Sequence, residues 1–102
     1  MAQEIRWSAA SSKDLESIFD FIARNSEDYA RITVERIVDA TDVLPRFPFI
    51  GREVPEYRDA RLRELIVYSY RVIYRVDLHA IHIVGVIHGA RRLKQALKGR
   101  RV

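Results

Sequence analysis

Three runs of alternating apolar residues between positions 61 and 92 constrain the fold of this chain more than any other feature. A period of two is the pattern of a β-strand with one buried face. Ser69 lies in the first break between the runs and Asp77 begins the second, and both residue types favour turns. We therefore expect three consecutive strands of one antiparallel sheet. The runs are Leu62–Val67, Tyr70–Val76 and Ala80–His88.

The sequence before these strands predicts a strand and two helices. Gln3–Trp7 alternates like a first strand, and serines at 8, 11 and 12 offer helix caps, with Ser11 and Asp14 spaced like a capping box. The first helix runs to about Arg24, and the second from about Glu27 to Leu44. The break between the two helices is so short that they must form an antiparallel hairpin.

These elements predict an α+β fold with the helical hairpin packed on one face of a small sheet. We expect about four mainly antiparallel strands, including the N-terminal one, followed by a short C-terminal helix or tail. At 102 residues the chain has room for one core, so we expect a single domain over residues 1–102. Residues 98–102 are expected to fray.

Side chains on the third and fourth strands divide into two faces. Val72, Tyr74, Ile83 and Ile87 form the apolar face expected to receive the helices. The opposite face mixes apolar residues with cationic or ionisable ones, so we expect a partner, a ligand or the C-terminal tail to cover it. Its polar members are Arg71, Arg75, His82 and His88.

Charge is divided unevenly along the chain. Residues 1–60 hold 8 Lys/Arg and 12 Asp/Glu, a net of −4, whereas residues 61–102 hold 10 Lys/Arg and 2 acids, a net of +8. Such asymmetry is typical of a basic surface that meets nucleic acid or an acidic protein, although a solvated charged surface is the simpler alternative.

Several kinds of chemistry are excluded or disfavoured. The chain has no cysteine, and its four glycines do not form a phosphate-binding loop. His82 and His88 are six residues apart on a strand, about 20 Å, which is too far to share a metal ion. We expect no metal and no cofactor. We also expect no membrane association and a cytoplasmic location, since no apolar run approaches 18–20 residues and the first residues lack a signal-peptide pattern.

A cluster of basic residues is the strongest functional signal. Such a cluster could bind RNA phosphates, and His88 alone has an ordinary pKa suited to proton transfer near neutrality. Pairing with acids elsewhere, such as Glu64 on the neighbouring strand, is the alternative for Arg71 and Arg75. Phe47 and Phe49 either anchor their loop in the core or form a patch that binds a partner. The cluster is Arg63, Arg71, Arg75, His88, Arg91 and Arg92.

The chain resembles the RelE/ParE superfamily of toxins from bacterial type II toxin–antitoxin modules, and its ParE branch in particular. The resemblance extends from about Ile5 to Leu97. Its most specific parts are Asp14-Leu15 with Ile18 and Phe21-Ile22-Ala23, Leu62-Arg63-Glu64, Tyr70-Arg71-Val72-Ile73-Tyr74, and His88-Gly89-Ala90-Arg91.

The ParE resemblance implies a growth-arresting toxin that inhibits DNA gyrase by binding rather than by catalysis. It also implies a ParD-like antitoxin whose C-terminal segment, apolar and acidic, wraps around the toxin. The basic cluster is then the expected target-binding surface. The residues expected to bind the antitoxin are Leu15, Phe19, Ile22, Val34, Val38, Phe47 and Phe49.

The RelE branch, which cleaves mRNA on the ribosome, is the first alternative. Its members typically carry lysines on the strand before the Tyr-Arg strand and a tyrosine near the C-terminus, and this chain has neither. A ribonuclease would use Arg71, His88 and Arg91. A binding domain of the same fold without toxicity is the second alternative.

Overall fold

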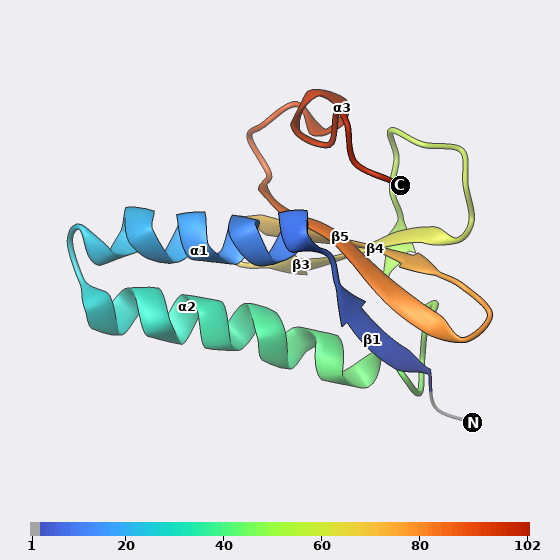
Figure 1. Cartoon of the computed structure of the whole chain (residues 1–102), viewed down its shortest axis with the longest axis horizontal. Coiled ribbons are helices and arrows are strands. Elements are labelled where there is room, and N and C mark those ends of the chain that lie inside the picture. The colour runs from blue at the N-terminus through green and yellow to red at the C-terminus, as the bar shows by residue number, and fades with distance from the viewer. Residues whose placement is uncertain (1–2) are drawn as a thin grey trace.

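The computed structural model describes residues 3–102, so Met1 and Ala2 of the predicted domain lie outside the described residues. Two helices cover one face of a sheet, and the C-terminal segment lies on the other side (Figure 1). The elements are β1 (Glu4–Trp7), α1 (Ala9–Ala23), α2 (Glu27–Ala40), the 3-10 turn η1 (Thr41–Val43), β2 (Arg52–Glu53), β3 (Leu62–Val67), β4 (Tyr70–Val76), β5 (Ala80–His88) and α3 (Leu93–Ala96).

The sheet confirms the predicted α+β class and adds one strand to it. Five strands lie in the order β1-β5-β4-β3-β2. β1 pairs in parallel with β5, and the remaining pairs are antiparallel. The fifth strand, β2, is two residues long and lies in the segment expected to be irregular, where it is too short to leave an alternating pattern.

Both long helices begin at serine caps. Ser26 caps α2 as predicted, since its hydroxyl accepts the backbone N–H of Tyr29. α1 instead begins at the cap Ser8, whose hydroxyl accepts the N–H of Ser11, so the predicted capping box of Ser11 and Asp14 is wrong. Ser11 is buried inside the first turn, and Asp14 is left for another role.

Two apolar cores lie on opposite faces of the sheet. The first packs the helices against the sheet and the second lies under α3, so the C-terminal tail is what covers the predicted mixed face. The first core contains Ile18, Ile37, Leu44, Val72, Tyr74, Val76, Ile81, Ile83 and Val86. The second contains Val54, Leu62, Ile73, Val84, Ile87, Leu93 and Leu97.

An irregularity in β5 corrects the predicted faces. Ile73 pairs with Gly85 and Tyr74 pairs with Ile83, so Val84 is an extra residue in the ladder. A bulge of this kind reverses the alternation beyond it. Ile87 therefore belongs to the second core and not to the helix-facing one.

A carboxylate near the start of the chain fastens its C-terminal segment. Asp14 accepts two guanidinium hydrogen bonds from Arg100, at 2.6 and 2.8 Å, and the backbone N–H of Val86 at 2.9 Å. Arg100 also donates to the carbonyl of Val84 at 3.2 Å. Fraying of residues 98–102 stays a prediction for the last two positions, but Arg100 is anchored to α1 and β5.

The loop before β2 is fixed by Tyr74. The backbone N–H of Gly51 donates to the Tyr74 hydroxyl at 3.0 Å, and both residues are buried. A Cβ atom at Gly51 would come within 2.5 Å of the Glu64 carbonyl oxygen, so only glycine allows this close approach. The hydroxyl thus ties the loop to the centre of the sheet.

We predict that Tyr74→Phe lowers the free energy of unfolding by about 1–2 kcal/mol, because the Gly51 N–H is left buried without an acceptor. Urea denaturation measures the loss. Tyr29→Phe is the matched control, since Tyr29 is 68% exposed, and its effect should stay within about 0.5 kcal/mol. Equal stability of the Tyr74→Phe variant and the unaltered protein would contradict the role assigned to this bond.

Candidate functional site

The predicted basic cluster is split by the fold into separate places. Arg71 and Arg75 lie on the second-core face of the sheet, whereas the bulge in β5 turns His88 to the helix side beside Tyr70. His88 and Tyr70 meet edge to face, with ring centroids 5.5 Å apart. The prediction that Arg71, Arg75, His82 and His88 share one face is therefore wrong for His88.

Arg71 is enclosed by two carboxylates. Its Nε donates to Glu64 at 2.6 Å, and its two terminal nitrogens donate to the two oxygens of Glu56 at 2.7 Å each. The Glu64 side chain is fully buried and also accepts a short hydrogen bond from Arg52. This arrangement confirms the alternative interpretation, in which Arg71 pairs with Glu64.

The pKa values in this network follow from its geometry. The bidentate hydrogen bond to Glu56, with Glu64 as the second partner, raises the pKa of Arg71 above its ordinary value. The same bond from Arg71 lowers the pKa of Glu56. Each of the three guanidinium nitrogens of Arg71 thus donates to a carboxylate within the fold, which makes it a structural clamp between β3, β4 and the loop after β2.

Arg75 and Arg63 are engaged elsewhere. Arg75 donates to Asp77 at 3.2 and 3.0 Å, and Asp77 also lies 3.0 Å from His82. The hydrogen bond from Arg75 lowers the pKa of Asp77. Arg63 donates to two backbone carbonyls and lies over the ring of Phe49 at 5.0 Å. These two arginines stabilise a turn and a loop.

Three members of the predicted cluster remain available, at the end of β5 and just after it. His88, Arg91 and Arg92 are exposed, and none of the three has a carboxylate partner among residues 3–102. Two hollows meet at Tyr70 and His88. The first, about 450 Å³, reaches from there to Arg71, and the second, about 430 Å³, reaches to Arg91.

The predicted ribonuclease residues are therefore near one another but not equivalent. His88 lines both hollows, while Arg71 and Arg91 line one each. Cleavage of RNA needs cations that can reach the scissile phosphate as its charge develops. Arg71 is buried and ion-paired with Glu56 and Glu64, whereas His88 and Arg91 are exposed and can meet a ligand.

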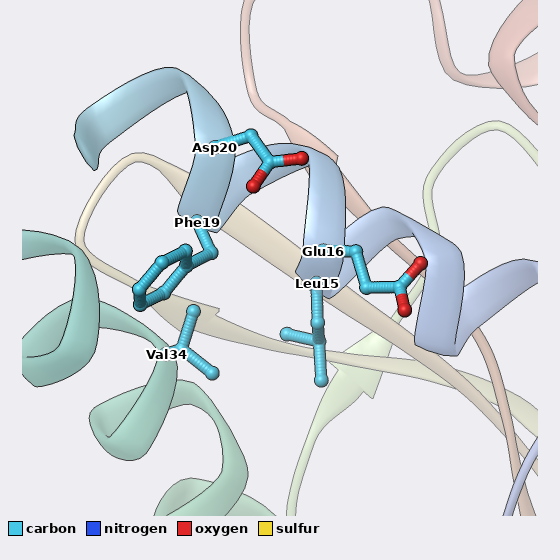
Figure 2. A pocket seen from close by; sticks show the side chains of 5 residues that line it. All are labelled: Leu15, Glu16, Phe19, Asp20 and Val34. Carbon is cyan, nitrogen blue, oxygen red and sulfur yellow. The ribbon is translucent and has the colours of Figure 1, made fainter. Parts of the chain in front are cut away.

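A groove between the two helices brings together three of the residues predicted to bind an antitoxin. It has a volume of about 510 Å³ and is lined by Leu15, Glu16, Phe19, Asp20 and Val34. Figure 2 shows Phe19 and Val34 pointing toward each other across the groove, while the carboxylates of Glu16 and Asp20 point away from its floor. The floor is apolar and the rim is acidic.

The other residues predicted to bind the antitoxin lie elsewhere. Ile22 is half-buried against the first core, and Val38 is half-buried on α2. Phe47 and Phe49 are 58% and 51% exposed and line a separate hollow of about 340 Å³ in the loop before β2. Their exposure agrees with a patch that binds a partner better than with anchors in the core.

Two further findings concern metals and membranes. Among residues 3–102, no three histidine or acidic side chains are placed so that they could hold a metal ion. In the same residues, no helix combines the length and apolar character needed to cross a membrane.

Sequence reasoning missed the partners that come from irregular segments. Glu56 and Arg52 lie in the stretch expected to be irregular, where no periodic pattern marks them. Arg100 lies in the segment that the sequence predicts to fray. Glu64 is the one partner that the sequence predicts, because β3 and β4 are adjacent strands and place it near Arg71.

Comparison with known proteins gives consistent matches. Residues 5–93 match the family described as the ParE toxin of the type II toxin–antitoxin system parDE. The candidate toxin Y4kP of Sinorhizobium fredii is 30% identical over 97 residues, which cover 93% of this chain and 97% of that protein.

Solved structures share the fold at lower identity. A chain of the chromosomal ParDE system from P. aeruginosa is 20% identical, with a TM-score of 0.72, over 85% of this chain and 96% of that chain. A chain of the RelBE2 toxin–antitoxin complex from Mycobacterium tuberculosis is 20% identical, with a TM-score of 0.61, over 86% and 99%.

The Glu56 carboxylate makes stability depend on acidity. Its pKa is lower in the folded chain than its ordinary value of 4.5. The stabilisation is therefore present above that value and is lost as the pH falls through the folded pKa. We predict that Glu56→Gln reduces the fall of the urea midpoint between about pH 7 and about pH 3. Glu16→Gln, at an exposed position on α1, should leave the fall unchanged. A full acid response in the Glu56→Gln variant would refute this assignment.

Proposed function

Because the chain belongs to the ParE toxin family of type II toxin–antitoxin systems, we propose that it arrests growth by inhibiting DNA gyrase and thereby replication. Its site of action is the cytoplasm, and a cognate ParD-like antitoxin neutralises it. The target-binding surface is the end of β5, with His88, Arg91 and Arg92.

The observation that carries this proposal is the internal pairing of the sheet arginines. Arg71 is held by Glu56 and Glu64, and Arg75 by Asp77. Of the predicted basic cluster, His88, Arg91 and Arg92 are exposed and lie together at one edge of the fold. An exposed basic edge beside apolar hollows suits docking onto a protein. It suits RNA cleavage poorly, since cleavage needs several cations and a proton donor around one phosphate.

The antitoxin is assigned to two places along α1. The apolar part of its C-terminal segment lies in the groove of Leu15, Phe19 and Val34, in the helix-in-groove mode. Its acidic part is repelled from the groove by Glu16 and Asp20 at the rim. It lies instead against the cationic side chains of His88 and Arg91. The related structure from Mycobacterium tuberculosis is itself a toxin–antitoxin complex, which supports such a partner.

Two parallel assays test the target. The purified protein is added to gyrase supercoiling reactions, with trapping of cleaved DNA, and to a translation reaction in which mRNA ends are mapped. We expect inhibition of supercoiling, accumulation of cleaved DNA and intact mRNA. Arg91→Ala should weaken the inhibition by about tenfold at unchanged stability, because an exposed arginine without a carboxylate partner is removed.

Cleaved mRNA with normal supercoiling would replace this proposal with the RelE-like ribonuclease. Normal supercoiling and intact mRNA, together with normal growth on expression, would identify a binding domain that lacks toxicity.

We predict that Val34→Asp makes the toxin resistant to its antitoxin without removing its toxicity, because a carboxylate is placed on the apolar groove floor. Growth on coexpression of toxin and antitoxin measures the effect. Ile32→Asp, at a residue of α2 that is 41% exposed and does not line the groove, is the matched control. Neutralisation of Val34→Asp as complete as that of the control would show that the antitoxin does not use this groove.

A further inference from the structure

The turn between β3 and β4 holds an exposed aromatic residue in an unfavourable backbone conformation. Tyr68 has a φ of +53°, and it is the one residue other than glycine with a positive φ in the described part of the chain. Bulky side chains rarely adopt this left-handed conformation, and glycine or asparagine is the usual choice in such turns. Tyr68 is nevertheless 59% exposed and belongs to neither apolar core.

The strained turn is fixed beside the available cations. The carbonyl of Ser69 accepts the backbone N–H of Gly89 at 2.7 Å, which ties the turn to the end of β5. Tyr68 and Ile66 line the hollow that reaches His88, and Ile66 is 55% exposed. We call the exposed residues Ile66, Tyr68, His88, Arg91 and Phe21 the tip surface.

The tip surface is continuous across both hollows. Phe21, which is 64% exposed, lines the hollow that contains Arg91, and this hollow shares Tyr70 and His88 with the hollow of Tyr68. Side chains from α1, β3, the turn and β5 thus meet at one edge. Exposed tyrosine, phenylalanine and arginine side chains around small hollows are the composition of a binding hot spot.

We propose that the tip surface grips the protein target of the toxin, with Tyr68 as its apolar anchor and Arg91 as its ionic contact. The target presents acidic side chains beside an apolar pocket. This inference rests on the proposed function and extends it, because it assigns Ile66, Tyr68 and Phe21 to the target-binding surface.

A protein fits this surface better than a nucleic acid does. Phosphates would use Arg91 and Arg92, but they would leave Ile66 and Phe21 in contact with water. A protein surface uses both kinds of contact, since apolar anchors are buried at its centre and charges pair around them. The backbone strain at Tyr68 has the same explanation, because strain that the fold does not need is kept where binding uses it.

Two matched substitutions test the proposal. Tyr68→Asn removes the ring and relieves the turn, since asparagine tolerates the left-handed conformation. Leu78→Asn likewise replaces a large exposed side chain by asparagine in a turn. Leu78 is 83% exposed and lies between β4 and β5, at the opposite end of β4 from Tyr68. Growth arrest, gyrase binding, antitoxin binding and thermal unfolding are measured for both.

We expect Tyr68→Asn to raise the Tm by a few degrees while it weakens gyrase binding by about tenfold or more and relieves growth arrest. Antitoxin binding in the helix groove should remain. Leu78→Asn should match the unaltered protein in binding and growth arrest.

Full growth arrest by Tyr68→Asn at equal expression would overturn the proposal. Binding of free duplex DNA is measured as well. If Tyr68→Asn weakens DNA binding as strongly as gyrase binding, the surface binds nucleic acid and the proposal is overturned. If the unaltered toxin arrests growth without binding gyrase, the gyrase target is wrong. The growth phenotype of Tyr68→Asn still decides whether the tip surface is used.

Discussion

The extra residue in β5 is the constraint from which the rest of the structure follows. Because Val84 is not paired in the ladder with β4, side chains beyond it change faces. His88 is brought to the helix side next to Tyr70, and Ile87 is placed under α3. Val86 lies beyond the part of β5 that pairs with β1, and its N–H donates to Asp14, which in turn holds Arg100. One inserted residue thus decides on which face of the sheet the side chains at the end of β5 lie.

Internal ion pairs determine which arginines of the predicted cluster can contact a ligand. A buried arginine is tolerated only with carboxylates around it, and Arg71 has two. Replacing either partner of such a pair leaves an uncompensated charge inside the protein, so these residues are needed for stability whatever the target is. The net charge of +4 therefore does not show which parts of the surface are basic. The end of β5 carries positive charge because the acids nearest to it, Glu56 and Asp14, are already paired with Arg71 and Arg100.

The periodic part of the sequence predicted most of the fold, and the irregular part hid most of the site. The three strands from Leu62 to His88 and the helical hairpin were predictable because side-chain alternation and apolar stripes are local signals. The parallel pairing of β1 with β5, the bulge at Val84 and the Glu56 partner of Arg71 depend on contacts between distant segments. Tyr68 gave no signal either, since a backbone conformation is not visible in a residue type.

The pairing of Asp14 with Arg100 also means that folding cannot be completed until the end of the chain has been synthesised. β1 must wait for the strand that begins at Ala80, and Asp14 must wait for a residue 86 positions later. Contacts of such long sequence separation form late. The helical hairpin, by contrast, contains its own contacts and can form while the rest is still being translated. The residues of the groove, Leu15, Phe19 and Val34, are therefore synthesised before the edge at His88, so the proposed antitoxin-binding segment precedes the proposed target-binding surface in synthesis.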